Sequence, residues 1–253
     1  GDHRDLHSFP TRRSFRSPET IEIAKTITSQ EAVLNKKQTS TIHIPELAKD
    51  ILEQIVFEAR KSEYVDVKSG VSARLSIAAF ENLVSTAERR LLHSNDEKTV
   101  IRMSDFMGII PAITGKIELV YEGEQEGAYG VALTLLGNAI KSLYSTYFPK
   151  IEKIEKQGVE TPYDEIVSWF FNNSDDFEIL DDIHEKDYTS ILKKIKPLSD
   201  FVKKYKEDVL SNELCFWQEF VLWSLVEHKK LTKYRYAEGV QFKDPYGSFM
   251  SGF

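Results

Sequence analysis

A single stretch, Asp66–Arg90, constrains the fold most strongly, because it combines a glycine-containing loop, a helix cap and an amphipathic helix. Gly70 can adopt backbone angles that other residues avoid, and Ser72 is a favourable N-cap residue. Beyond them, apolar residues recur at steps of four and three, at Ala73, Ile77, Phe80, Val84, Ala87 and Leu91. This spacing places them in one stripe along a helix. The stretch therefore predicts a long helix that begins near Ser72 and packs one face against other elements.

Arg74 falls in the first turn of this predicted helix, on the shoulder of the apolar stripe. The unpaired N–H groups of a first turn make that end of a helix positive, so a cation there is mildly disfavoured. The positive helix end and the Arg74 guanidinium, side by side, form a favourable binding site for an anion such as a phosphate. The alternative interpretation is that Arg74 only pairs with a nearby carboxylate. The residue pattern by itself leaves both interpretations open.

The segment Ser69-Gly70-Val71-Ser72-Ala73-Arg74 resembles the small-residue loop and arginine that open a lid-domain helix in magnesium-chelatase-type and MoxR-type AAA+ ATPases. In that family the arginine is called sensor 2 and contacts the nucleotide phosphates. A second block, Thr114–Ala128, is similar to the same region of bacterial magnesium-chelatase ATPase-subunit homologues. The resemblance extends from Pro18 to the end of the chain, and it is specific in the two blocks and looser toward the C-terminus.

The resemblance implies a mostly α fold, with an AAA+ helical lid domain at residues 18–149 and a helical accessory region at residues 150–253. We place the seam at Phe148-Pro149, because a charged run follows it. The implied function is ATP-driven remodelling by a homo-oligomeric ring. In photosynthetic relatives this work is the insertion of magnesium into protoporphyrin, and in MoxR-type relatives it is the assembly or activation of client proteins. Arg74 would sense the phosphates of its own subunit's nucleotide or of a neighbour's.

A P-loop, which would let the chain bind and hydrolyse ATP by itself, is not found in the sequence. Its G-x-x-x-x-G-K-[ST] pattern follows a strand, so that backbone N–H groups, a lysine and a hydroxyl meet the phosphates. The look-alike Thr114-Gly115-Lys116-Ile117 lacks the first glycine and has an isoleucine in place of the hydroxyl. We therefore expect the C-terminal part of an ATPase, cut from its core by an incomplete gene read. ATP and Mg²⁺ would bind in the full-length parent, and this chain would hold no catalytic residue.

Three acidic residues of the second block, Glu122, Glu124 and Glu126, alternate with glycine and glutamine. Carboxylate clusters can bind hard cations, or raise one another's pKa for acid–base chemistry. Gly123 and Gly127 instead indicate a tight, exposed turn that leads into a helix, whose N-terminal end favours acids. The alternative is a subunit contact, in which Lys116 supplies the opposite charge.

Charge and cysteine content exclude several classes of function. The net charge of −7 argues against nucleic-acid binding, which requires a basic face. Cys215 is the only cysteine, which favours a reducing, cytoplasmic compartment, and its apolar neighbours indicate packing rather than nucleophilic chemistry. No apolar stretch is long enough to cross a bilayer, and the run Leu214–Val226 predicts a buried helix.

The remaining polar groups show no pattern typical of a metal site. The histidines outside the first residues share no ligand spacing with one another or with Cys215: His43, His93, His184 and His228. The acidic segments 172–176 and 181–182 lack the glycine and terminal glutamate of a calcium loop and indicate a solvated linker. The basic run Lys229–Tyr236 alternates charged and aromatic residues. We interpret it as a solvated helix end rather than as a phosphate-binding site.

Apolar spacing predicts further helices on both sides of the central one. One starts at Pro18 and a stronger one at Pro45, with a polar connector at residues 35–40 between them. After an extended piece at Thr99–Arg102, Ser104 caps a helix that starts at Asp105 and is kinked by Pro111. Later helices are expected at residues 126–148, 163–171, 187–194, 198–204 and 213–228, whereas residues 234–253 show no assignable pattern.

Residues Gly1–Ser17 resemble the in-frame translation of a common short-read sequencing adapter, which ends in a one-base slip at Ser14–Ser17. An ordinary basic N-terminal arm is the alternative. We expect this segment to be a disordered artefact and exclude it from the reasoning on the fold. For the rest of the chain, the hypothesis that competes with the ATPase fragment is a free-standing helical interaction module, in which Arg74 is only a salt-bridge residue.

Overall fold

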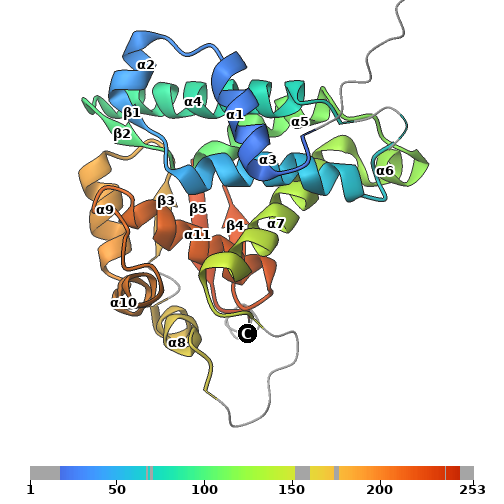
Figure 1. Ribbon diagram of the computed structural model, residues 1–253. Coiled ribbons are helices and arrows are strands. Elements are labelled where there is room, and N and C mark those ends of the chain that lie inside the picture. Colours follow the sequence, from blue (N-terminus) through green and yellow to red (C-terminus); the bar gives the residue numbers. More distant parts are fainter. Residues whose placement is uncertain are drawn as a thin grey trace, which may run out of the picture.

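The computed structural model describes residues 18–66, 68, 71–151, 160–173, 177–236 and 238–245. The expected artefact at residues 1–17 and the loop glycine Gly70 lie outside these ranges. Within them the chain is mostly helical, with eleven α-helices, one 3-10 helix and two small sheets. The expectation of a mostly α fold is therefore confirmed at the level of fold class. Figure 1 shows the elements in order along the chain.

The first ten elements run from the start of the described chain to the helix at its middle. In order they are α1 (Ile21–Glu31), α2 (Lys36–Thr41), β1 (Ile42–His43), α3 (Glu46–Lys61), α4 (Arg74–Ser94), β2 (Thr99–Val100), the 3-10 helix η1 (Met103–Ile109), α5 (Ile110–Thr114), α6 (Tyr121–Glu126) and α7 (Ala128–Tyr147). The remaining seven elements are α8 (Asp164–Asn173), β3 (Glu178–Leu180), α9 (Glu185–Lys193), α10 (Lys196–Tyr205), α11 (Leu214–Glu227), β4 (Thr232–Arg235) and β5 (Gly239–Lys243).

The central helix α4 forms where the apolar pattern predicts it. Its first N–H, that of Arg74, donates to the Ser72 hydroxyl at 3.2 Å, although the N-cap position is Ala73, one residue after the predicted cap. Its C-terminal end is Asn95, whose φ of 56° lies in the left-handed region. The predicted stripe is buried from Phe80 onward. In the first turns Ala73 and Ile77 are only half-buried, and Leu75, Ala79 and Leu83 are buried instead.

Three local predictions in the first part are wrong. The first helix begins at Ile21 rather than Pro18, because the Thr20 hydroxyl accepts the Ile23 N–H. The polar connector at residues 35–40 is instead the short helix α2, which a capping box between Asn35 and Gln38 stabilises. The helix expected from Asp105 is a 3-10 helix followed by α5, and Pro111 sits in the first turn of α5, where a missing N–H costs nothing.

The interpretation of Lys229–Tyr236 as a solvated helix end is also wrong. Residues 232–235 form β4, which pairs antiparallel with β5, and β5 pairs in turn with β3. Lys233 turns toward the protein, with its Nζ 3.4 Å from the centre of the Trp223 ring. This three-stranded sheet accounts for part of the region that shows no helical pattern.

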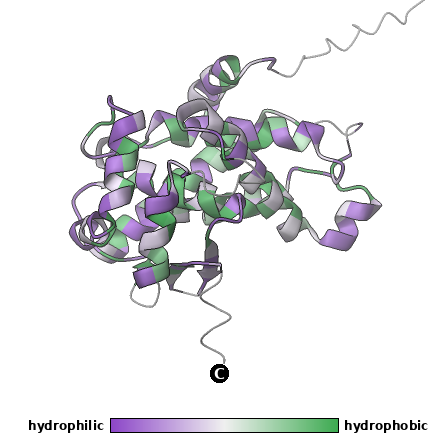
Figure 2. Cartoon of the chain, turned by 90° about the horizontal axis from the view of Figure 1, so that it is seen from below, coloured by the Kyte–Doolittle hydropathy of each residue, from purple (hydrophilic) through white to green (hydrophobic). Residues whose placement is uncertain are grey.

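One hydrophobic core extends across the predicted seam at Phe148-Pro149. Helix α7 packs against α3 on one side and against α11 on the other. Phe148 itself is buried, and its ring stacks on those of Tyr144 and Phe201 at centroid distances of 5.3 Å. Figure 2 shows hydrophobic and hydrophilic residues alternating along the helices of the molecule. The residues on both sides of the seam therefore pack together, and the division into two domains stays a prediction.

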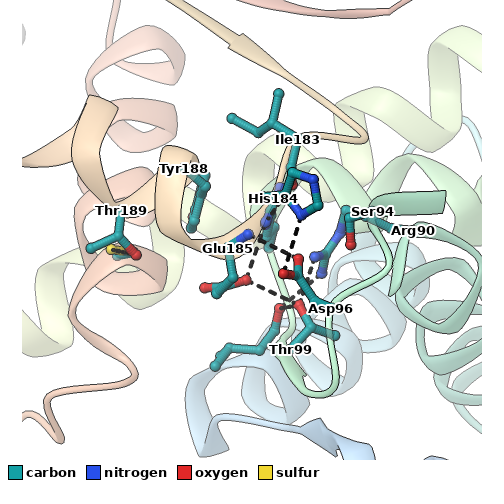
Figure 3. A network of polar contacts seen from close by, with 12 residues as sticks. Arg90, Ser94, Asp96, Thr99, Ile183, His184, Glu185, Tyr188 and Thr189 are labelled. Carbon is teal, nitrogen blue, oxygen red and sulfur yellow. Dashed lines mark hydrogen bonds and ion pairs between the residues drawn. The ribbon is translucent and has the colours of Figure 1, made fainter. Parts of the chain in front are cut away.

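A polar network also joins the two parts. Arg90 of α4 donates to the Thr99 hydroxyl at 2.7 Å, and that hydroxyl donates to the Glu185 carboxylate at 3.1 Å. The backbone N–H of Glu185, at the start of α9, donates to the Asp96 carboxylate at 2.9 Å. Figure 3 shows these side chains converging from α4, β2 and α9. The end of α4 is thereby fixed to the start of α9.

Candidate functional site

Arg74 is the first residue of α4, and its side chain is exposed. The first turn of α4 contains no acidic residue. In the described ranges, no hydrogen bond or ion pair of its guanidinium is found. The alternative in which Arg74 pairs with a carboxylate therefore finds no partner among the described residues. A free cation at a positively polarised helix start is the arrangement that favours an anion.

Arg60, a residue that the sequence analysis did not single out, holds the segment that leads into α4. Its guanidinium donates to the Val71 carbonyl from Nε at 3.4 Å and from Nη2 at 3.3 Å, and to the Pro18 carbonyl at 3.2 Å. The same guanidinium lies 5.1 Å from the centre of the Phe57 ring. Burial lowers the pKa of Arg60 from its ordinary value. No sequence pattern identifies such a residue, because its acceptors are backbone carbonyls brought close only by folding.

A buried carboxyl lies beneath the first turn of α4. The Thr28 hydroxyl of α1 is 2.5 Å from the Glu53 carboxylate of α3 and 3.0 Å from the Ser76 hydroxyl of α4. Glu53 is only 2% exposed, and burial raises its pKa above the usual value. Because the three side chains come from three helices, they fix the start of α4 against α1 and α3.

The second block of family resemblance, Thr114–Ala128, lies beside residues 64–66, which precede the first block in the sequence. Val65 and Leu119 form an antiparallel bridge, and the Asp66 N–H donates to the Glu118 carbonyl at 2.8 Å. Gly123 is buried against this junction, where an added Cβ would lie 2.4 Å from the Tyr64 carbonyl oxygen. Residues 64–66 are therefore attached to the segment that leads into α6.

The acidic residues of the second block lie on a short helix, which corrects the expected turn. Glu122, Glu124 and Glu126 are exposed on α6, and the turn comes only after it, at Gly127 with φ 86°. Lys116 is exposed as well, and no ion pair joins it to these glutamates in the described ranges. Figure 2 shows α6 as a largely hydrophilic helix at the right edge of the molecule. The structure thus presents an acidic surface on α6, and a subunit contact between these glutamates and Lys116 stays a prediction.

An open cavity of about 730 Å³ adjoins this acidic surface, and Glu63, Tyr64, Glu122 and Glu126 contribute to its lining. Two tyrosines flank the glutamates, with Tyr121 69% and Tyr129 58% exposed. No described contact links Arg74 to Lys116 or to the three glutamates. The predicted site residues therefore form two separate surfaces, one cationic at the start of α4 and one acidic on α6.

The arrangement at Arg74 is suited to holding an anion, and no nucleophile or acid–base pair accompanies it among the described contacts. Cys215 is buried in α11, its thiol contacts Thr189 at 3.7 Å, and burial raises its pKa to about 11. Among the described residues, no group of three or more His, Cys, Asp or Glu side chains is positioned to hold a metal ion. No helix in the described ranges combines the length and apolar character of a membrane span.

Comparison of the whole chain with protein-family models, with curated proteins and with solved structures gave no match.

Proposed function

We propose that this chain forms the helical lid of an AAA+ ATPase similar to magnesium chelatase and MoxR proteins, with Arg74 as its sensor-2 arginine. The single observation that carries the proposal is the exposed guanidinium of Arg74, which begins α4 without a described partner. Pairing with a phosphate would satisfy both this charge and the positive end of the helix. ATP and Mg²⁺ belong to an ATPase core supplied by another stretch of polypeptide, within a cytoplasmic homo-oligomeric ring.

The contacts around the start of α4 support this role for Arg74. Arg60 holds the Val71 carbonyl, and the buried Glu53 joins α1, α3 and α4 beneath the first turn. A cation that senses phosphate must be held in place before the ligand arrives, because ordering it afterwards would reduce the binding energy. The fixed helix start gives Arg74 that preorganised position.

The proposal is tested in a full-length homologue that contains its own P-loop. Replacement of the arginine at the position of Arg74 by alanine is expected to lower ATP turnover about 10- to 100-fold, since a charge-assisted hydrogen bond to phosphate contributes about 1.5–3 kcal/mol. The matched control replaces the residue at Arg89, an exposed arginine on the same helix, and should leave turnover unchanged. Equal turnover by the Arg74 variant and the parent would remove the proposed role.

A helical interaction module is the second candidate, and the surface of α6 favours it. The exposed Tyr121 and Tyr129 beside three glutamates resemble a contact surface more than a solvated face. The genomic sequence upstream of Pro18 distinguishes the candidates. An in-frame P-loop and acidic strand motif would support the ATPase, whereas a start codon near Pro18 would support the module.

A further inference from the structure

A second cavity, which Arg74 does not line, is surrounded by basic side chains. Its volume is about 950 Å³, and its lining includes Lys141, Lys150, Glu227, His228, Lys229 and Lys230. Lys141 comes from α7 and Lys150 from the segment after it, whereas the other four residues belong to the end of α11 and the turn that follows. Two parts of the chain that are far apart in sequence therefore bring their cations to one hollow. Its size is within the range of small-molecule sites.

The described lining of this cavity contains more lysines than carboxylates. Lys141, Lys150 and Lys229 accompany one carboxylate, that of Glu227, in a chain whose net charge is −7. The Glu227 carboxylate lies against α7, where a Cβ added at Gly137 would be 2.4 Å from its Oε2. In the described ranges, Lys141, Lys150 and Lys229 form no ion pair. Like charges that share a partly enclosed space repel one another, and an anion between them removes that repulsion.

The backbone of Lys229 supplies an independent observation. Its φ of 61° lies in the left-handed region, where glycine is the favoured residue. The turn is a Schellman motif, in which the Lys230 N–H donates to the Leu225 carbonyl at 2.8 Å and the Lys229 N–H to the Val226 carbonyl at 2.9 Å. Glycine would fit this position with less strain. A lysine in a strained conformation at the rim of a basic cavity points to a use for its side chain.

Helix electrostatics accounts for only part of the cluster. Cations at the C-terminal end of a helix are stabilised by its dipole, which explains basic residues after α11. The dipole of α11 does not explain Lys141, which lies within α7, and Lys150 follows the C-terminal end of that second helix. His228 is held in this group by its Nδ1, which donates to the Ser224 carbonyl at 2.8 Å. The convergence on one cavity, rather than the end of one helix, is therefore the feature to explain.

We propose that this cavity binds a small polyphosphate anion, with Lys141 and Lys229 as its main contacts. Lysines act as point charges toward phosphate, and several cations around one cavity suit a ligand with more than one phosphate group. The proposal is independent of the role of Arg74. Inorganic tripolyphosphate is the probe, and ATP used in parallel shows whether a nucleoside adds to the affinity.

The experiment is isothermal titration of the full chain with tripolyphosphate at low ionic strength, with thermal unfolding followed in the same buffer. Saturable binding to one site is expected, and the double variant Lys141→Gln/Lys229→Gly should weaken it at least tenfold. Lys229→Gly alone should weaken binding without lowering Tm, because glycine relieves the left-handed strain. The matched control, Lys203→Gln/Lys204→Gln, removes two exposed lysines of α10 and should leave the affinity unchanged.

Two results would overturn the proposal. One is an absence of saturable binding by the parent chain. The other is an equal loss of affinity in the α10 control and in the cavity variants, which would indicate attraction by surface charge alone. Arg74→Ala should bind tripolyphosphate as the parent does. Failure of the parent chain to bind tripolyphosphate would therefore contradict only the cavity site, whereas unchanged ATP turnover in the homologue's variant at the position of Arg74 would contradict only the proposed function.

Discussion

Arg90 and Asp105 form a buried ion pair joined by two hydrogen bonds, from Nε to Oδ1 at 3.1 Å and from Nη2 to Oδ2 at 2.8 Å. Their side chains are only 4% and 2% exposed. The same carboxylate accepts the Arg102 N–H at 2.8 Å, so it also caps the 3-10 helix η1. The pair therefore fixes the end of α4 to the segment that enters α5.

Asp105→Asn is expected to destabilise the protein by about 3–5 kcal/mol, because it leaves the Arg90 charge buried without a counter-charge. Urea unfolding followed by circular dichroism measures the change. Arg89→Gln, on the exposed side of the same helix, should change stability by less than about 0.5 kcal/mol. If Asp105→Asn proves as mild as this control, the ion pair is not what holds α4 to η1.

Gly123→Ala is expected to move α6 away from the segment that contains Tyr64. The new Cβ would lie 2.4 Å from the Tyr64 carbonyl oxygen, so the backbone of one segment must move, at a cost of about 1–3 kcal/mol. Hydrogen exchange should show faster exchange of the Val120 N–H, which donates to that carbonyl at 3.1 Å.

Gly130→Ala is the matched control for this substitution. Its Cβ would meet only the flexible Glu126 side chain, at 3.2 Å, and alanine favours the helix that contains it. This variant should be neutral or slightly stabilising. A comparable destabilisation by both variants would contradict a specific close approach at Gly123.

Arg60→Lys keeps the charge but loses the planar fork that reaches the Val71 and Pro18 carbonyls. We expect a loss of stability of about 1 kcal/mol and faster hydrogen exchange in the first turn of α4, where Arg74 begins the helix. Exchange in α11 should not change. Unaltered exchange at the start of α4 would show that Arg60 does not position it.

Lys233 predicts a measurable dependence of stability on pH. Burial lowers its pKa to about 8, below the ordinary value of 10.5, so between these two pH values the unfolded chain binds more protons than the folded one. The contribution of Lys233 to stability therefore rises as pH increases through this window.

Lys233→Met should abolish the pH dependence of stability that Lys233 causes. It should also raise the free energy of unfolding at pH 7 by about 1–2 kcal/mol, because no charge has to be buried. The advantage of the variant over the parent should shrink as pH rises from 8 to 10, as measured by urea unfolding at each pH. A constant difference across the window would show that Lys233 titrates normally.

The start and end of α4 follow from the sequence alone, and so does the burial of α11. Ser72 and Asn95 act within one turn of the helix that they bound, and the apolar spacing of α4 repeats along a single element. The nearly uniform apolar run Leu214–Val226 has to be buried whatever its neighbours are, and its Gln218 and Glu219 are buried with it. Such signals are local, so no other part of the chain is needed to interpret them.

The tertiary structure alone determined the contacts that form the candidate sites. The bridge between Val65 and Leu119, the bonds from Arg60 to the Val71 carbonyl and the pairing of β4 with β5 join residues whose partners no local pattern specifies. The sequence predicts a solvated helix end for the basic residues after α11, because it gives the charge of each lysine but not the surroundings of its side chain. Lys141 and Lys229 line the same cavity only because α7 packs against α11, and burial of the apolar residues between the two helices drives that packing.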